Sequence, residues 1–239
     1  MVTRLEYLRI DGKVGKLKKG SARNSVSIVI VSGKKENKTL QSLRNLPEGS
    51  EVIVSTKQGL GFARNYGASQ CHNDLMVQLD DDLQVKPSLW RWVQNLKVGE
   101  FAMGTVDGVN PATRVFAIYL QDFVAVGGFD NSFRYVYEDW DFFRRATKQE
   151  LEFRPVPVNL YTHIDHPNRT QGPKRFKIAW ECAKFWAKYP SYTDDLLGKR
   201  GIYYNSVSLF IFPLRALDFR IFLVRFFGAL YWLGVWRKR

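Results

Sequence analysis

Short apolar runs alternate with segments of helical spacing in the first hundred residues, and this alternation constrains the fold more than any other feature. The run VSIVIV at 26–31 is continuous and β-branched, as expected of a strand buried on both faces. Further strands are predicted at 51–54 and 75–79, with helices at 35–46, 60–71 and from Pro87 onward. Strands separated by helices predict a parallel α/β sheet. In open sheets of this kind the ligand binds at the carboxyl ends of the strands.

The predicted strand LMVQL at 75–79 runs directly into Asp80, Asp81 and Asp82. Carboxylates so close together raise one another's pKa unless a cation neutralises them. A hard divalent ion, Mg²⁺ or Mn²⁺, takes such oxygen ligands and usually keeps phosphate oxygens as further ligands. The alternative is a solvated acidic loop ahead of the helix that begins at Pro87. The triplet alone does not decide between the two.

A second acidic group, Glu138, Asp139 and Asp141, follows a Gly127-Gly128 pair. These acids precede a helical stretch, where the positive end of the helix stabilises negative charge. A carboxylate held there near neutral pH can act as a general base. The alternative is a helix cap with ion pairs to Arg144 and Arg145.

Two of the three histidines, His163 and His166, follow a predicted strand at 156–161. A lone histidine is more often structural than a ligand. At a strand end, in a chain that already has an acidic triplet, either histidine is a candidate for completing a metal site.

The net charge of +13 is concentrated in the two ends of the chain. Residues 1–25 carry a net +5 and residues 199–239 a net +7, which leaves the middle near neutrality. Charged ends on a neutral body suit an anionic surface better than a nucleic-acid groove, and no nucleic-acid-binding motif accompanies them. Cys71 and Cys182 give no disulfide framework, which indicates a reducing compartment. The first residues lack an apolar segment typical of a secretory signal.

The chain is divided into a basic hairpin and linker at 1–25, a catalytic domain at 26–190 and C-terminal amphipathic helices at 191–239. Residues 226–236 are eleven consecutive apolar residues, and a spanning helix needs about 20. Pro213 separates two predicted helices, at about 202–212 and 214–236. Tyr231, Trp232 and Trp236 beside a basic end favour attachment at a membrane surface. The alternative is a helix packed on the catalytic body.

Several segments in order resemble the family 2 glycosyltransferases, which have the GT-A fold. They are SVSIVIV (25–31), GLGFARNYGAS (59–69), LMVQLDDDLQVKPSLW (75–90) and VGGFDNSFRYVYEDWDFFRR (126–145). The resemblance covers about 60% of the chain. It implies an inverting, metal-dependent hexosyltransferase that moves a sugar from a nucleotide diphosphate sugar to an acceptor.

The resemblance also implies roles for individual residues. Asp82 matches the metal-ligating member of the acidic (DXD) motif, with Asp80 as a second ligand and His163 as a less secure third, and His166 as its rival. Asp139 matches the acceptor-activating base. The residues implied to bind substrate are Arg64 and Asn65 beside the nucleotide, Asp80 and Asp81 near the ribose and sugar, and Glu138 and Trp140 around the acceptor.

The chain departs from the family after its second strand, where an aspartate usually holds the nucleobase or ribose. Ser55-Thr56-Lys57-Gln58 stands there instead, so the nucleobase is not predicted. The C-terminal helices are similar to those of dolichyl-phosphate sugar synthases. We therefore expect a peripheral enzyme at the cytoplasmic face of a membrane, with a glycan or a lipid-phosphate acceptor and no nucleic-acid partner. The alternatives are a glycosyltransferase with a soluble acceptor and packed C-terminal helices, and a non-catalytic basic binding protein on a GT-A scaffold.

Overall fold

The computed structural model describes residues 25–32, 37–105, 111–164, 174–189 and 219–236. The chain divides into two compact units, which are described separately. The first comprises residues 1–134 and 138–165, and the second comprises residues 135–137 and 166–239. The predicted hairpin at 1–25 and the predicted helix at about 202–212 lie outside the described residues, apart from Ser25.

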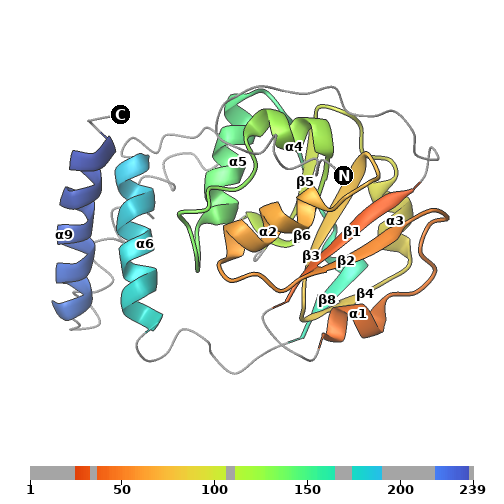
Figure 1. Ribbon diagram of the computed structural model, residues 1–239, viewed down its shortest axis with the longest axis horizontal. Coiled ribbons are helices and arrows are strands. Elements are labelled where there is room, and N and C mark those ends of the chain that lie inside the picture. The colour runs from red at the N-terminus through yellow and green to blue at the C-terminus, as the bar shows by residue number, and fades with distance from the viewer. Residues whose placement is uncertain (1–24, 33–36, 106–110, 165–173, 190–218, 237–239) are drawn as a thin grey trace. The chain divides into compact units, whose positions relative to one another are not determined.

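The first unit is an α/β domain (Figure 1). Its strands are β1 (Val26–Val31), β2 (Glu51–Ser55), β3 (Leu75–Asp80), β4 (Leu83–Val85), β5 (Glu100–Thr105), β6 (Pro111–Tyr119), β7 (Glu152–Pro155) and β8 (Tyr161–His163). Its helices are α1 (Lys38–Ser42), α2 (Leu60–Ser69), α3 (Ser88–Val93), α4 (Leu120–Val126), α5 (Glu138–Lys148) and the short 3₁₀ helix η2 (Val158–Leu160).

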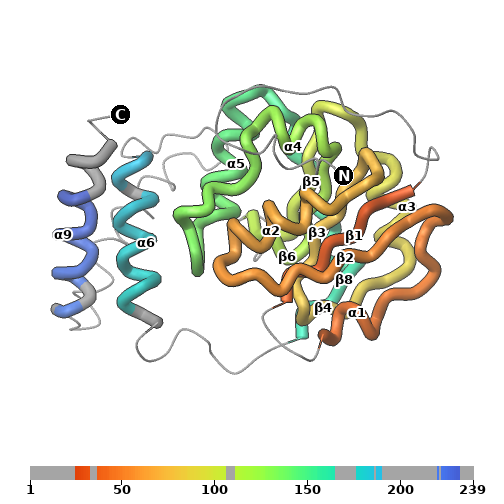
Figure 2. Tube along the Cα trace, in the orientation of Figure 1, coloured from red at the N-terminus to blue at the C-terminus, as the bar shows by residue number. Residues whose placement is uncertain are grey.

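The central sheet is mostly parallel, with the strand order β2-β1-β3-β6-β5-β7. β1 pairs in parallel with both β2 and β3, and β5 pairs in parallel with β7. β6 is antiparallel to both of its neighbours, β3 and β5. A separate two-stranded sheet joins β4 to β8. Figure 2 follows the same path as a continuous tube.

Alternate residues of the central strands enter separate apolar layers on the two faces of the sheet. On one face, Val77 and its neighbours pack with Trp90 of α3 and with residues of β4 and β8. On the other face, Met76 and its neighbours pack with α2, α4 and α5 through a phenylalanine-rich cluster that includes Phe116 and Phe142. Burial on both faces explains why β1 and β3 are apolar apart from Ser27, Gln78 and the terminal Asp80.

Most of the predicted elements in the first half of the chain are confirmed. Two predicted elements, one of them in the second half, differ more strongly from the structure. The described part of the helix predicted at 35–46 is only the short α1, where the Asn37 side chain accepts from the Leu40 N–H and begins the helix. The strand predicted at 156–161 is wrong, because Val158–Leu160 forms a 3₁₀ turn and the strand begins only at Tyr161.

The second unit contains α6 (Lys174–Lys188) and α9 (Phe219–Trp236), which lie side by side (Figure 1). Gly228 makes this close packing possible, since an added Cβ there would lie 3.0 Å from the Ala183 Cβ. Tyr135–Tyr137 also belongs to this unit. Glu181 of α6 accepts from the N–H groups of Tyr135 and Val136, at 2.9 and 2.8 Å.

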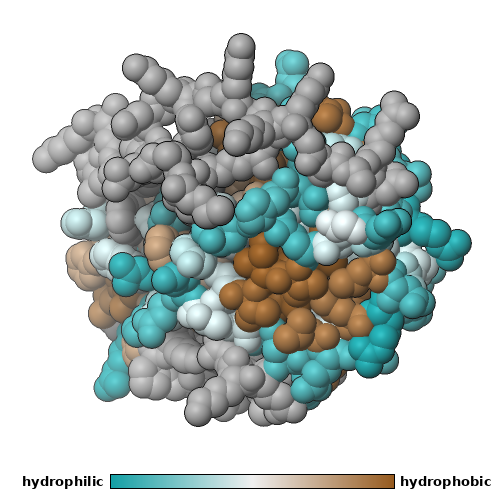
Figure 3. Space-filling view, turned by 45° about the vertical axis from the view of Figure 1, so that its right-hand side comes forward, coloured by the Kyte–Doolittle hydropathy of each residue, from teal (hydrophilic) through white to brown (hydrophobic). Residues whose placement is uncertain are grey.

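Apolar side chains are also exposed on both units. The first unit exposes Leu40, Val52 and Val54, and Figure 3 shows a continuous apolar area bordered by polar side chains on one face of the molecule. On α9, the exposed apolar side chains are Phe226, Phe227, Leu230 and Tyr231. Within the described residues, no helix combines the length and the apolar character needed to cross a bilayer.

Candidate active site

The candidate site lies at the edge of the sheet where β1, β2 and β3 end. In the parallel register, Val31 pairs with Ser55 on one side and with Asp80 on the other. The Ser32 N–H then donates to the Ser55 carbonyl at 2.9 Å, which joins the two strand ends. The aspartate triplet is therefore at the carboxyl edge, where an open sheet binds its ligand.

Thr39, a fully buried residue of α1, holds the turn that carries the triplet. Its Oγ1 donates to the Asp80 carbonyl at 2.6 Å and accepts from the Leu83 N–H at 2.8 Å. The Asp81 side chain accepts from the Ser32 hydroxyl at 3.0 Å, and the Asp81 backbone carbonyl accepts from the Thr39 N–H at 3.3 Å. Neither Thr39 nor Ser32 was predicted as a site residue. For Ser32 the sequence offers one indication, a polar residue directly after a buried strand. For Thr39 it offers none.

Asp82 and His163, two of the predicted metal ligands, lie side by side. The pairing of β4 with β8 sets Leu83 opposite His163, and the Ile164 N–H donates to the Asp82 carbonyl at 2.8 Å. This register leaves Nε2 of His163 3.6 Å from Oδ1 of Asp82. His166, the rival to His163, lies outside the described residues.

Asp80, the other predicted ligand, is bonded to an arginine. Its Oδ1 lies 2.8 Å from Nη2 of Arg64. In the part of the chain that the structure describes, no group of three or more histidine, cysteine, aspartate or glutamate side chains is placed to hold a metal ion. The role of Asp80 as a metal ligand therefore stays a prediction.

Arg64 of α2 bridges the triplet and the first turn of α5. It is almost completely buried, and its Nε lies 3.7 Å from Oε1 of Glu138. Among the described residues, its Nε and Nη1 and the Oε2 of Glu138 are buried without a hydrogen-bond partner. Buried polar atoms of this kind are costly unless a partner satisfies them. Arg64 and Glu138 therefore carry unsatisfied polar atoms between the triplet and α5.

The acidic groups around Arg64 have shifted pKa values. Burial raises the pKa of Asp80, while the positive charge of Arg64 opposes the shift. Burial raises the pKa of Glu138 to about 8, and the charge of Asp139 adds to the effect. Burial also raises the pKa of Asp139 to about 6, although the Trp140 N–H donates to its Oδ1 at 2.8 Å. Burial thus favours the protonated form of both acids, and because they interact they titrate as a pair, in a range suited to proton transfer near neutral pH.

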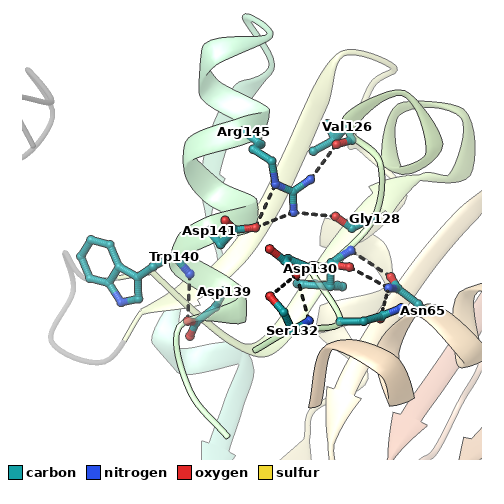
Figure 4. Close-up of polar contacts among 11 residues, drawn as sticks. Asn65, Val126, Gly128, Asp130, Ser132, Asp139, Trp140, Asp141 and Arg145 are labelled. Carbon is teal, nitrogen blue, oxygen red and sulfur yellow. Dashed lines mark hydrogen bonds and ion pairs between the residues drawn. The ribbon is translucent and has the colours of Figure 1, made fainter. Parts of the chain in front are cut away.

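Asn65 and Trp140 were both predicted to bind substrate, and these roles stay predictions. The Asn65 side chain is engaged by the backbone of Phe129 and by Asn131 (Figure 4). The Trp140 ring points away from these loop contacts (Figure 4), and its side chain is partly exposed. Arg145, given by the sequence as a possible ion-pair partner of the second acidic group, does pair with Asp141, and its guanidinium also donates to two carbonyls.

The model of a known family, described as glycosyl transferase family 2, matches residues 16–162. The chain belongs to glycosyl transferase family 2. It is therefore a glycosyltransferase, as the sequence motifs predicted. No curated protein matches the chain.

Two solved structures, one from Drosophila and one from Pyrobaculum calidifontis, are similar to this chain. One is a mutant Drosophila β1,4-galactosyltransferase 7 in complex with manganese, UDP-Gal and xylobiose. It has 11% identity and a TM-score of 0.50, over 62% of this chain and 76% of that one. The other is a mannosyltransferase from Pyrobaculum calidifontis in complex with GDP-Man and Mn²⁺. It has 11% identity and a TM-score of 0.51, over 85% of this chain and 73% of that one. The likeness shows a shared fold, the predicted GT-A fold.

Proposed function

We propose that this family 2 glycosyltransferase is an inverting, metal-dependent enzyme that takes its sugar from a nucleotide diphosphate sugar. The observation that carries the proposal is the position of Asp82 beside His163, at the carboxyl edge of the parallel strands. The two similar solved structures contain manganese and a nucleotide sugar, UDP-Gal in one and GDP-Man in the other, which supports the same ligand classes here.

The residues present are suited to a divalent metal ion. Oδ1 of Asp82 is buried, and its 3.6 Å separation from Nε2 of His163 exceeds hydrogen-bond distance. A carboxylate oxygen and an imidazole nitrogen suit Mn²⁺, and a carboxylate with phosphate oxygens suits Mg²⁺. Asp82 and His163 would hold the ion, with Asp80 close by. When bound, the ion would neutralise negative charge on the diphosphate leaving group.

Asp139 is the general base in this proposal. Burial raises its pKa to about 6, closer to neutral than that of an ordinary aspartate, which suits a carboxylate that takes a proton from an acceptor hydroxyl. The acceptor oxygen then attacks the anomeric carbon on the face opposite the leaving diphosphate, which inverts the configuration. Glu138, whose pKa burial also raises, lies next to Asp139, and Arg64 links it to Asp80.

The acceptor is proposed to be lipid-linked or a polyprenyl phosphate, reached from the cytoplasmic face of a membrane to which the protein binds peripherally. The basic ends of the chain support this, because cytoplasmic leaflets carry anionic lipids. The exposed side chains of α9, Phe227 and Leu230 among them, give the second unit an apolar surface for the lipid interface. A polyprenyl phosphate is already ionised, so with that acceptor Asp139 would contribute less to the rate.

A test of the donor site is thermal stabilisation by UDP, GDP and their sugars, with and without Mn²⁺. A ligand that binds only the native state raises its stability with concentration. We expect one nucleotide to stabilise the protein in the presence of metal, and Asp82→Ala to abolish the effect. Asp122→Ala is the matched control, because Asp122 accepts from the Gly99 N–H in a different part of the unit.

A test of the base is turnover in Asp139→Asn. With a hydroxyl acceptor we expect turnover to fall by about 10² to 10⁴-fold, the usual contribution of general base catalysis. Nucleotide stabilisation should persist in this variant. The proposal would be wrong if no nucleotide stabilised the wild-type protein with metal at millimolar concentration, with or without lipid vesicles.

A further inference from the structure

The loop at 127–131 is held from two helices at once. It follows α4 and precedes α5, and both of its glycines have positive φ, +87° at Gly127 and +64° at Gly128. The ring of Phe129 packs between Phe116 and Phe142, with ring centroids 5.3 and 4.9 Å apart. These contacts fix the middle of the loop in the aromatic layer. Two polar side chains then fix its backbone.

Asn65 of α2 holds the loop from one side. Its Oδ1 accepts from the Phe129 N–H at 2.9 Å, and its Nδ2 donates to the Phe129 carbonyl and to Oδ1 of Asn131, both at 2.7 Å. Both donors of the amide are therefore used inside the protein. Gly61 brings the same helix close to the loop, since a Cβ there would lie 2.8 Å from the Asp130 carbonyl.

Arg145 of α5 holds the loop from the other side. Its Nη1 donates to the Val126 carbonyl and its Nη2 to the Gly128 carbonyl, both at 2.6 Å. Asp141, fully buried one turn earlier, lies 2.9 Å from Nε and 2.8 Å from Nη2 and fixes the guanidinium plane. Figure 4 shows the Arg145 and Asn65 contacts converging on the loop from the two helices.

We propose that Asn65 and Arg145 are positioning residues which, through the loop at 127–131, set the distance between Arg64 on α2 and the Glu138–Asp139 pair on α5. The contact of Arg64 with Glu138, 3.7 Å from Nε to Oε1, joins the same two helices, so the loop contacts and this contact depend on the same helix spacing. This inference rests on the proposed function for its catalytic consequence. It differs from the role that the sequence motif implied for Asn65, which was a nucleotide contact.

The first test separates positioning from nucleotide binding in Asn65→Ala. We expect kcat to fall by about 10²-fold, because a displacement of about 1 Å near reacting groups has such an effect. The affinity for the stabilising nucleotide with Mn²⁺ should stay within about 2-fold. A loss of nucleotide affinity of about 10-fold or more with unchanged kcat would overturn the proposal and make Asn65 a nucleotide contact.

Asn73→Ala is the matched control. Asn73 is also a buried asparagine, and its amide bonds to the Ser25 hydroxyl and the Gly49 carbonyl. We expect this variant to lose stability and to keep the wild-type kcat per folded molecule. A similar loss of kcat in Asn73→Ala would show that general destabilisation explains the effect, and would overturn the proposal.

A second variant, Arg145→Lys, tests the other side of the loop. Lysine keeps the charge but cannot form the forked contacts of a guanidinium. We expect a fall in kcat without a fall in nucleotide affinity, as in Asn65→Ala. In the double variant the two effects should be less than additive, because both residues act through one loop. Strict additivity would contradict a shared loop.

Amide hydrogen exchange tests the loop contacts without catalysis. Exchange at the Phe129 N–H should accelerate in Asn65→Ala and stay at the wild-type rate in Asn73→Ala. This readout holds even if no donor or acceptor is found. Failure of the proposed function would thus appear as a wild-type protein without transfer activity. Failure of the present proposal would appear as unchanged exchange at Phe129.

Discussion

At the scale of single residues, Glu138 ties the stability of the protein to pH. Its carboxyl is buried beside Asp139, and the burial raises its pKa from an ordinary 4.5 to about 8. Between these two pH values the folded state binds more protons at this group than the unfolded state does. By linkage, the stability that protonated Glu138 contributes is fully present below about pH 4.5 and is lost as the pH rises through about 8.

Glu138→Gln removes this titration while keeping nearly the same shape. In the metal-free wild-type protein we expect the contribution of this group to lower the free energy of unfolding as the pH rises from 5 to 9. In Glu138→Gln this part of the pH dependence should disappear, so that the variant is the more stable protein at pH 9. Urea unfolding at several pH values measures the difference, with exposed Glu152→Gln as the control. Parallel curves for wild type and Glu138→Gln would contradict the burial of a titrating carboxyl.

At the scale of elements, the hydroxyl of Thr39 links α1 to the turn after β3. Its hydroxyl ties the Asp80 carbonyl to the Leu83 N–H, so the short helix fixes the direction of the acidic triplet. Thr39→Val replaces the hydroxyl by a methyl group and leaves the Leu83 N–H without its acceptor. We expect a loss of about 1–3 kcal/mol in unfolding free energy, together with weaker metal-dependent nucleotide binding.

Thr147→Val is the control for that substitution. Within the described part of the chain, the Thr147 hydroxyl donates to carbonyls of its own helix alone, at Phe143 and Arg144, and Thr147 is less buried than Thr39. Its replacement should have little effect on stability and none on nucleotide binding. If Thr39→Val lost stability but bound the nucleotide with metal as tightly as the wild type, the direction of the triplet would not depend on α1.

Elements whose position follows from the residues of their own segment could be predicted from the sequence. Elements that depend on pairing with a distant segment could not. The runs at β1 and β3 are recognisable because both faces of each strand are buried, and the aspartates that follow are placed by the rule for parallel strands. β8 depends on its pairing with β4, nearly eighty residues earlier in the chain, and no local pattern shows this. β6 is antiparallel within a mostly parallel sheet and was not predicted either.

The residues of the candidate site likewise divide into those that the sequence placed and those whose contacts depend on tertiary packing. Asp82 and His163 were predicted as neighbours from the motif and the strand end, and the structure brings them together. The buried bridge from Arg64 to Glu138 joins two helices about seventy residues apart in the chain, so its geometry depends on tertiary packing. The contacts of Asn65 with the loop at 127–131 likewise required the structure.

At the scale of the whole molecule, the charge of the chain and the exposed side of α9 bear on the proposed membrane contact. Gly228 and Ala229 of α9 are buried, and Gly228 lies close to Ala183 and Trp180 of α6. Phe227 and Leu230 of the same helix are exposed by 59% and 52%. These two large apolar side chains therefore present much of their surface to solvent, and we expect that surface to enter a lipid interface.

Liposome flotation tests this contact. We expect the wild-type protein to float with vesicles that contain anionic lipid, and less at high salt, because basic residues contribute through a screened attraction. Phe227→Glu with Leu230→Glu should leave most of the protein in the soluble fraction. The matched pair Val98→Glu with Val158→Glu changes equally exposed apolar residues of the first unit and should float like the wild type. A wild-type protein that stays soluble with every vesicle would instead favour the soluble-acceptor alternative, in which α9 serves only to complete the packing of the second unit.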